Sequence, residues 1–327
     1  MLPIFQTNNI LYAWQHGVLM KVLVTGCKGQ LGSTLMDLWS GRLQGDSTPG
    51  LSMKETSVHA HEVIGLDIRG TDDEIVVHDI TKPLYPYPDA RLENLDCIVH
   101  CAAQISVASS MDDPTMDSMT NIAGTVNLLE LARRTGVRKF INISSAAIFG
   151  NPEFLPIDES HPTKPLSPYG LSKLSAEKYA LLYGEMFHME VVSIRPFNIF
   201  SERMEPDNPY AGVITIFIEN LLKDEEIAVF GDGEQTRDFI YVEDVARFID
   251  ICTKDGVQGI FNCATGNRAT LNELIDILAE LTGKEPKVKY QEPRDGDIRH
   301  SYADITAAKR LGFEPKFSLK DGLARLL

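Results

Sequence analysis

The chain has 327 residues, of which 43% are hydrophobic and 24% charged, a composition that indicates a globular protein with a substantial core rather than a disordered chain. Its formal net charge of −15 argues against a general affinity for nucleic acid or anionic membranes. No apolar run approaches the ~20 residues that a membrane-spanning helix needs.

Five cysteines are present without the paired spacing of a metal site. Most lie in or beside apolar runs, so we expect buried free thiols in a reducing, cytoplasmic compartment, and no metal.

The segment from Met1 to Met20 contains no Lys or Arg. It therefore lacks the charged start of a secretory signal and the Arg-rich character of a transit peptide. The folded pattern begins directly afterwards at Lys21, so we expect residues 1–20 to be an N-terminal extension, with Met20 a candidate native start.

Short apolar runs alternate with longer amphipathic stretches through residues 21–195. The apolar runs predict strands at 21–25, 62–66, 75–78, 97–101, 139–143 and 191–194. The amphipathic stretches predict helices near 30–40, 113–135 and 169–188. Buried β-branched strands separated by helices indicate a parallel sheet covered on both faces, which is a Rossmann-type, doubly wound α/β domain.

The rhythm changes after Arg195 and Pro196, where helices and short strands alternate with loops rich in Gly, Pro and Asp. We expect residues 196–327 to form mainly a smaller α/β substrate-binding domain. Segment 259–263 is a candidate strand that returns to the first sheet. Residues 40–57 are rich in Gly, Ser and Thr and predict an exposed loop.

A glycine-rich turn follows the first predicted strand. Its sequence is Gly26-Cys27-Lys28-Gly29-Gln30-Leu31-Gly32. The glycines allow a sharp turn, a close approach to a pyrophosphate and tight packing of the next helix, whose N-terminus offers free N–H groups to the anion. The strand before the turn and the helix after it make this a predicted dinucleotide site.

An acidic residue, Asp67, ends the second predicted strand and is followed by Ile68. A carboxylate there can accept a hydrogen bond from the adenosine ribose 2′-OH and would repel a 2′-phosphate, which favours NAD over NADP. The separation from the glycines is about twice the ~20 residues expected, and the loop at 40–57 accounts for the excess. The alternative is a surface aspartate at a strand end.

Tyr169 and Lys173 stand four residues apart and so share one face of a predicted helix. A lysine charge ~5 Å from the phenol, at an effective dielectric of ~20, lowers its pKa by about two units and brings it close to a useful general base. Upstream, Ser145 follows an apolar strand, at the edge of the sheet where ligands bind. Either feature alone is explained by chance or by a turn serine, but together with the glycine turn they indicate an active site.

These residues resemble the extended short-chain dehydrogenase/reductase family and, within it, the NAD-dependent epimerase/dehydratase group that includes UDP-glucose 4-epimerases. The resemblance runs from Lys21 to near the C-terminus. It implies that Ser145, Tyr169 and Lys173 are the catalytic set and that NAD is the cofactor. The residues that it implies for NAD binding are Gly26, Gly29, Gln30, Leu31, Gly32, Asp67, Ile68, Asp79, Ile80, Cys101, Ala102, Ala103, Asn121, Tyr169, Lys173 and Phe197.

The second half of the chain resembles the sugar-nucleotide half of the family at 195–198, 231–238 and 294–297. The residues implied for substrate binding are Ser145, Tyr169, Asn198, Phe230, Arg237, Arg294, Asp297 and Ser301. Two arginines from separate loops can clamp a diphosphate by charge-assisted hydrogen bonds inside an acidic protein. The alternative is that Arg237 and Arg294 form surface salt bridges with Asp238 and Asp297.

Ala146 and Ala147 follow Ser145, at positions where dehydratases of this group carry an Asp-Glu pair. The resemblance therefore implies a UDP-hexose 4-epimerase that acts on UDP-glucose and UDP-galactose through a transient 4-keto sugar. Ser301 matches the position that limits the sugar 2-substituent, and its small side chain predicts that N-acetylated sugars are accepted. An alignment shifted by one residue would place Tyr302 there and predict the opposite.

Other readings are a nucleotide-sugar dehydratase, a decarboxylase or a uronate epimerase of the same family. A non-catalytic NAD-sensing protein is a further alternative, against which the complete set of Ser145, Tyr169 and Lys173 argues. The resemblance also implies a homodimer formed through the helices at 113–135 and 169–188. Phe149 departs from the family, which often has tyrosine at this position.

Overall fold

The computed structural model describes residues 20–43, 61–70, 75–204, 212–294 and 296–327. Met20 is the first of these residues and is buried directly before the first strand. The predictions for residues 1–19 and for the loop at 44–57 lie outside the described residues.

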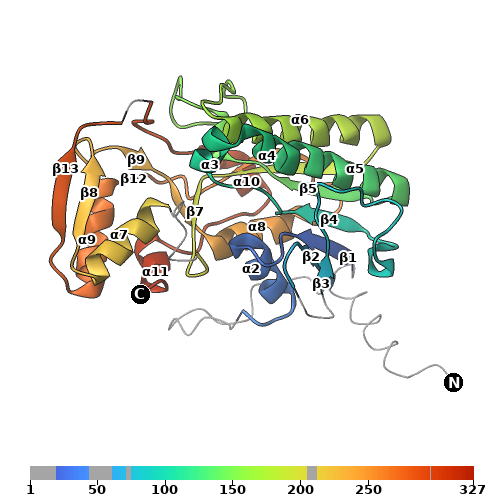
Figure 1. Cartoon of the computed structure of the whole chain (residues 1–327), viewed down its shortest axis with the longest axis horizontal. Helices are drawn as coiled ribbons and strands as arrows, with labels where there is room; N and C mark the ends of the chain where they lie inside the picture. The colour runs from blue at the N-terminus through green and yellow to red at the C-terminus, as the bar shows by residue number, and fades with distance from the viewer. Residues whose placement is uncertain (1–19, 44–60, 71–74, 205–211, 295) are drawn as a thin grey trace.

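A seven-stranded sheet forms the centre of the molecule (Figure 1). In spatial order its strands are β11 (Gly259–Cys263), β6 (Glu190–Pro196), β5 (Lys139–Ile143), β4 (Cys97–His100), β1 (Lys21–Thr25), β2 (Glu62–Asp67) and β3 (Ile75–Val77). All neighbouring strands are parallel. The chain order reverses between β1 and β4, and such sheets bind ligands at the carboxyl ends of the strands beside this reversal. The predicted Rossmann-type α/β fold is confirmed.

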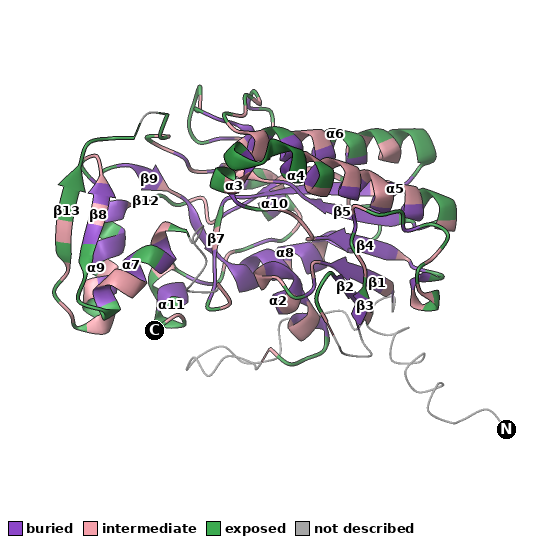
Figure 2. Cartoon of the chain, in the orientation of Figure 1, coloured by how far each residue is buried: buried purple, intermediate pink, exposed green. Residues whose placement is uncertain are grey.

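Helices cover both faces of the sheet, so its strands are buried between two layers (Figures 1 and 2). The helices α5 (Gly124–Thr135) and α6 (Pro168–Phe187) lie on one face. The helices α2 (Gln30–Trp39) and α8 (Val242–Cys252) lie on the other and pack against each other. Trp39 Nε1 donates a hydrogen bond of 2.7 Å to Asp250 Oδ1 across that contact. Burial on both sides explains why the strands read as continuous apolar runs.

The six strands predicted within residues 21–195 are all present, with ends that differ by at most two residues. The helix predicted at 113–135 is instead three segments: α4 (Pro114–Ser118), a π-helical turn (Met119–Ala123) and α5. Thr125, at the start of α5, donates from its Oγ1 to the carbonyl of Asn121 in that turn at 2.6 Å. A π turn inserts a residue without interrupting the apolar pattern strongly, so hydrophobic periodicity does not reveal it.

Smaller strand pairs extend from one side of the sheet (Figure 1). They are β7 (Asn198–Phe200) with β10 (Phe239–Tyr241), β9 (Thr236–Arg237) with β12 (Ala269–Thr270), and β8 (Glu226–Phe230) with β13 (Lys287–Gln291). Helices α7 (Val213–Leu222) and α9 (Leu271–Thr282) pack together beside β8.

Two elements from the C-terminal half pack with the large sheet. The candidate segment 259–263 forms its edge strand β11, paired with β6, and α8 covers one face. The shorter helices are α3 (Val107–Asp112), α10 (Thr306–Arg310) and α11 (Leu319–Ala324), together with 3₁₀ turns at Ala90–Leu92 and Ala146–Ile148.

All five cysteines are free, and four of them are buried. Within the described ranges no group of His, Cys, Asp and Glu side chains is arranged to hold a metal ion. None of the described helices is long and apolar enough to cross a membrane.

Candidate functional site

A cavity of about 1120 Å³ opens at the carboxyl ends of the central strands. It runs from Asp67 and Asp79 past the glycine turn to Arg237. This volume exceeds the ~300–1,000 Å³ typical of a single small ligand, so it has room for a dinucleotide and a substrate together. The predicted site residues that line it are Gly26, Gly29, Gln30, Leu31, Gly32, Asp67, Ile68, Asp79, Ile80, Cys101, Ala102, Ala103, Ser145, Tyr169, Lys173, Phe197, Asn198, Arg237 and Ser301.

The glycine turn has no room for side chains at two points. A Cβ on Gly26, whose φ is +67°, would lie 2.7 Å from Ala102 Cα. A Cβ on Gly32 would lie 2.2 Å from the carbonyl oxygen of Gly26. Gly29 is the residue directly before α2, and no side chain caps the first turn of this helix. The turn and its first N–H groups therefore form a cradle suited to the pyrophosphate of a dinucleotide.

Asp67 lies at the end of β2, with 7% of its surface exposed. Its Oδ2 accepts a hydrogen bond from the backbone of Lys28 at 3.0 Å, and its Oδ1 accepts one from the backbone of Arg69 at 3.1 Å. A carboxylate has lone pairs beyond these two, so it can also accept from a ribose hydroxyl. Its fixed negative charge suits NAD better than NADP.

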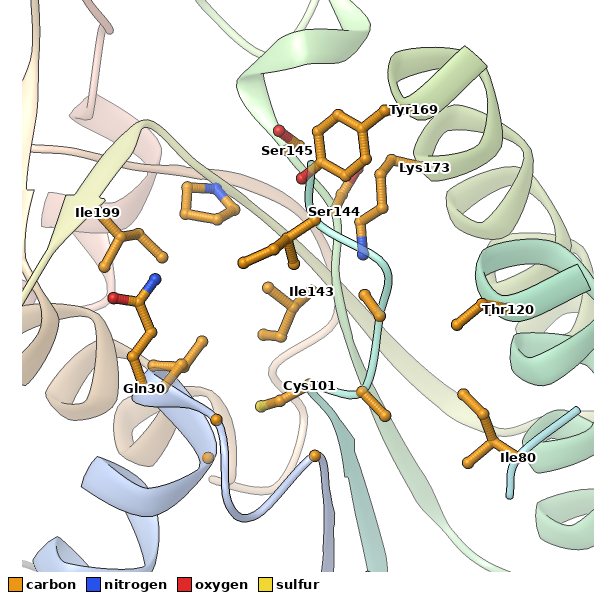
Figure 3. A pocket seen from close by; sticks show the side chains of 18 of the residues that line it. Gln30, Ile80, Cys101, Thr120, Ile143, Ser144, Ser145, Tyr169, Lys173 and Ile199 are labelled. Atoms are coloured by element: carbon orange, nitrogen blue, oxygen red, sulfur yellow. The ribbon is translucent and has the colours of Figure 1, made fainter. Parts of the chain in front are cut away.

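Ser145, Tyr169 and Lys173 gather on one wall of the cavity (Figure 3). Ser145 follows β5 and accepts a hydrogen bond from the backbone of Ala147 at 3.1 Å. Tyr169 lies in the first turn of α6, which Ser167 caps by accepting from Gly170 N at 3.1 Å. Lys173 follows one turn later, and 6% of its surface is exposed. The spacing of four residues thus brings the phenol and the ammonium to the same wall.

The electrostatics of this wall correct one prediction. Burial raises the pKa of Tyr169, and a side-chain hydrogen bond with Ser145 lowers it in part. Burial lowers the pKa of Lys173 to about 8. The sequence predicts a Tyr169 pKa below its ordinary value, but in the folded chain that pKa is raised, because burial disfavours the charged phenolate.

His100 holds the end of β4 beneath the cavity. Its Nδ1 lies 2.9 Å from Thr25 Oγ1, and its Nε2 lies 2.9 Å from Thr125 Oγ1. Burial lowers the pKa of His100 to about 3, so the ring is neutral. Thr25 Oγ1 also accepts from the backbone of Ala102 at 3.2 Å, which fixes the chain opposite Gly26.

Asn121, predicted to bind the cofactor, lies behind the wall instead of lining the cavity. Its Oδ1 accepts from Gln104 N at 2.9 Å, and its Nδ2 donates to Gln104 O and Ser172 Oγ, both at 3.0 Å. Asn121 thus joins the loop after β4 to α6.

At the far end of the cavity, Arg237 Nη2 lies 2.9 Å from Asp297 Oδ1. The salt bridge considered as an alternative is therefore present for this arginine, which still lines the cavity. Arg294 instead lies with its guanidinium carbon 3.7 Å from the centre of the Phe230 ring. Phe230, Arg294 and Asp297 are not among the residues that line the cavity.

The model of the NAD dependent epimerase/dehydratase family matches residues 22–264. The chain belongs to this family. It is 36% identical over 315 residues to the UDP-glucose 4-epimerase of Mycolicibacterium smegmatis, and the match covers 94% of this chain and 97% of that protein. It is 34% identical over 239 residues to the UDP-glucuronate 4-epimerase of Thermodesulfobacterium geofontis, and the match covers 71% of each chain.

The fold is also similar to the crystal structure of the UDP-glucose 4-epimerase of Thermotoga maritima with UDP-glucose. The TM-score is 0.82 at 34% identity, and the match covers 94% of this chain and 97% of that one. The protein is accordingly an NAD-dependent enzyme that modifies nucleotide sugars.

In this member of the epimerase/dehydratase family, Ser301 lies in the cavity wall with 9% of its surface exposed. Tyr302 does not line the cavity, and Arg268 lies 5.7 Å from its ring centre. The alternation of side chains along the chain explains why these neighbours point in different directions. Phe149, the departure from the family, is buried, and the guanidinium of Arg195 lies 5.1 Å from its ring centre.

Several residues of the epimerase/dehydratase cavity were missed by the sequence analysis. Ser144 lines it and is buried, and its Oγ has no hydrogen-bond partner in the described ranges. Arg69 and Lys82 line the end near Asp67 and Asp79. Each follows a predicted residue by no more than three positions, so closeness in sequence to the predicted residues was the available signal.

Proposed function

We propose that the protein is an NAD-dependent UDP-hexose 4-epimerase that interconverts UDP-glucose and UDP-galactose through a transient 4-keto sugar. One observation carries the proposal: Ser145, Tyr169 and Lys173 share a wall of the cavity with Ala146 and Ala147. The two positions directly after Ser145 therefore carry no acidic side chain. The same cavity contains the dinucleotide cradle and Arg237.

Tyr169 is the proposed base that takes the proton from the sugar 4-hydroxyl, and Ser145 hydrogen-bonds the same oxygen. With a pKa of about 8, Lys173 is mostly charged at neutral pH and stabilises the phenolate of Tyr169. NAD, when bound, supplies the hydride acceptor and donor at C4, and its positively charged ring favours that phenolate. After the 4-keto sugar has rotated in the cavity to present its opposite face, Tyr169 returns the proton and the epimer is complete.

The cavity wall argues against elimination. A dehydratase must remove the C5 proton and protonate the departing 6-hydroxyl, and both steps need a positioned acid or base. Ala146 and Ala147 occupy the wall beside Ser145 and offer neither.

The distribution of charge argues against a uronic-acid substrate. Among the residues that the structure describes, the Lys and Arg side chains lining the cavity are Arg69 and Lys82 at the cofactor end, Lys173 on the catalytic wall and Arg237 at the opposite end. A carboxylate on C6 would need a cation or several donors of its own. The wall next to Ser145 presents alanine methyl groups, which suit a neutral hexose.

We further infer that the enzyme accepts UDP-GlcNAc and UDP-GalNAc. The small side chain of Ser301 faces the cavity, and Tyr302 does not. A hydroxymethyl group there leaves more room beside a sugar 2-substituent than a tyrosine would.

The test is incubation of the purified protein with UDP-galactose, UDP-GalNAc and UDP-glucuronate in separate reactions, without added NAD, and chromatography of the products. Conversion of the first two to their gluco epimers, with UDP-glucuronate unchanged, is expected. Conversion of UDP-glucuronate alone would move the assignment to a uronate epimerase. No conversion of any substrate, even with added NAD, would overturn the proposal.

A further inference from the structure

A buried polar cluster lies directly behind the catalytic wall and has no part in the proposed chemistry. It contains Asp117 of α4, Asn121 of the π-helical turn, Gln104 of the loop after β4 and Ser172 of α6. Asp117 Oδ1 accepts hydrogen bonds from Gln104 Nε2 at 2.9 Å and from Asn121 Nδ2 at 3.1 Å. Asn121 Nδ2 also donates to Ser172 Oγ at 3.0 Å, and Ser172 is the neighbour of Lys173. The cluster therefore joins α4 to the helix that carries the base.

Asp117 has fewer partners than a buried acid normally has. Its side chain is fully buried, and its Oδ2 has no hydrogen-bond partner among the described residues. Asp117 also forms no salt bridge within the described part of the chain. A buried carboxylate is unfavourable unless an opposite charge offsets its lost hydration.

Asp117 acts electrostatically on the positive charge of Lys173. Helix α4 packs against α6, and the charge of Asp117 raises the pKa of Lys173 against the burial that lowers it. The same charge adds to the burial that raises the pKa of Tyr169. One carboxylate thus acts on both members of the catalytic pair.

The other titratable groups around Lys173 do not supply a net charge of this kind. Glu177 of α6 is paired with Arg195 of β6 at 2.7 Å, so its charge is compensated. Burial raises the pKa of Cys101 to about 12 and lowers that of His100 to about 3, so both are neutral at physiological pH. Around Tyr169, the further group is the neutral hydroxyl of Ser145.

We propose that Asp117 is a positioning residue that keeps the ammonium of Lys173 charged and in place behind the catalytic wall, and thereby sets the pH range in which the Tyr169–Lys173 pair works. Asp117 is not among the residues that line the cavity, so it acts through Lys173 and the Asn121 contacts. The activity readout rests on the proposed epimerase function.

The sign of the effect follows from the charge. Removing a negative charge from beside both groups makes it easier for each of them to lose its proton. Tyr169 and Lys173 titrate as a coupled pair, so both limbs of the bell-shaped profile of kcat/KM shift toward lower pH. For an unscreened charge close to both groups, a shift of about 1 pH unit is expected. A purely structural loss would lower the profile without moving its limbs.

The experiment measures kcat/KM against pH, with UDP-galactose, for the full-length NAD-containing enzyme and four variants. Asp117→Asn and Asp117→Ser both remove the charge, and both are expected to shift the two limbs downward. Having the two variants guards against misfolding of either, which circular dichroism and gel filtration would reveal. Asp117→Glu keeps the charge and should leave the limbs in place, although the profile is lower. Asp112→Asn removes an exposed charge near the end of α3 and should leave the profile unchanged.

A second readout is independent of turnover. Lysine labelled with ¹³C at Cε reports the titration of Lys173 by NMR, with its signal assigned from its absence in Lys173→Met. The midpoint should fall in Asp117→Asn and stay in Asp112→Asn. Unmoved limbs and an unmoved midpoint would overturn the proposal, as would limbs that move in opposite directions. If the wild-type protein epimerises no UDP-sugar, the proposed function fails, while the NMR midpoint still decides the role of Asp117.

Discussion

The hydroxyl of Tyr169 is the single group on which the proposed proton transfer depends. Tyr169→Phe keeps the ring and removes the base, so epimerisation should fall by ~10²–10⁴-fold. NAD should remain bound, because the glycine turn and Asp67 are untouched. Turnover of UDP-galactose and the nucleotide released from the denatured protein measure the two effects.

Tyr179→Phe provides the matched control for this substitution. Tyr179 lies on the same helix with 42% of its surface exposed, away from the cavity lining. Its variant should retain full activity and full NAD content. Undiminished turnover in Tyr169→Phe would contradict the proposed mechanism, in which Tyr169 is the base.

At Ser301, side-chain volume is predicted to decide which sugars enter. Ser301→Tyr would fill the cavity beside the sugar 2-substituent, and conversion of UDP-GalNAc should fall about tenfold or more relative to UDP-galactose. The ratio of the two kcat/KM values measures this selectivity. Tyr302→Phe, which changes a side chain outside the cavity lining, should leave the ratio unchanged. An equal loss of both activities in Ser301→Tyr would mean that the residue does not act as a gate.

At the scale of elements, the turn between β1 and α2 tests the dinucleotide cradle. In Gly32→Ala the new methyl group would lie 2.2 Å from the carbonyl oxygen of Gly26, so helix and turn must separate. In Gly29→Ala the nearest contact is the same oxygen at 3.3 Å, which a small shift relieves. We expect Gly32→Ala to lose bound NAD and thermal stability, and Gly29→Ala to keep most of both. Fluorescence titration with NADH and thermal denaturation compare the two variants, and equal NAD affinity would contradict the cradle.

The elements with strong periodicity were predictable from the sequence, and those shaped by specific contacts were not. The apolar run of β1 predicts a buried strand because every residue in it packs against a neighbouring layer. The π-helical turn is accompanied by a hydrogen bond from Thr125 Oγ1 to the carbonyl of Asn121, a contact that a periodic pattern does not contain.

The predicted site shows the same division. Residues adjacent to strand ends, such as Asp67 and Ser145, follow from topology, since the carboxyl ends of parallel strands meet at one edge. The pairing of Arg294 with Phe230 involves segments about sixty residues apart, and no local signal in either segment encodes that contact. The pKa of Tyr169 depends on how much water the folded wall excludes, which spacing alone does not give.

At the scale of the whole molecule, Asp244 joins α8 to the C-terminal segment by accepting backbone hydrogen bonds from Lys316 at 3.0 Å and Phe317 at 3.1 Å. Burial raises its pKa from 3.8 to about 6. Because the folded-state pKa lies above the unfolded value, the stabilisation is present in acid and is lost as the pH rises through about 6.

This linkage gives a prediction for Asp244→Asn. The free energy of unfolding of the wild type should exceed that of the variant by more at pH 5 than at pH 8, with a change on the order of 1 kcal/mol. Urea denaturation of both proteins at the two pH values measures it. A difference that stays constant, or grows with pH, would contradict the assignment.

The outer face of α6 carries an exposed apolar stripe, and this helix lies on the surface of the molecule (Figure 2). Leu171, Tyr179, Leu182 and Met186 are between 42% and 58% exposed, and their spacing places them on one side of the helix. Met111, an exposed methionine of the neighbouring α3, extends the stripe. Contiguous apolar surface of this kind marks an interaction site.

We propose that a second copy of the chain covers this stripe around a two-fold axis, as self-complementary interfaces do. Light scattering after gel filtration should give twice the mass of the chain. The double variant Leu182→Glu/Met186→Glu buries charges against each other at that interface and should be monomeric. Leu222→Glu, an equally exposed leucine on α7, should remain dimeric.

The same helix presents Tyr169 and Lys173 to the cavity and the apolar stripe to the proposed partner. Dimer contact would then hold α6 from outside while the Asp117 cluster holds it from within. We therefore expect the monomeric double variant to lose kcat/KM as well as stability, with the loss of activity appearing at protein concentrations where it is monomeric and the wild type is not. Full activity in a proven monomer would separate the catalytic wall from the interface and leave the internal contacts of α6 sufficient to position the pair.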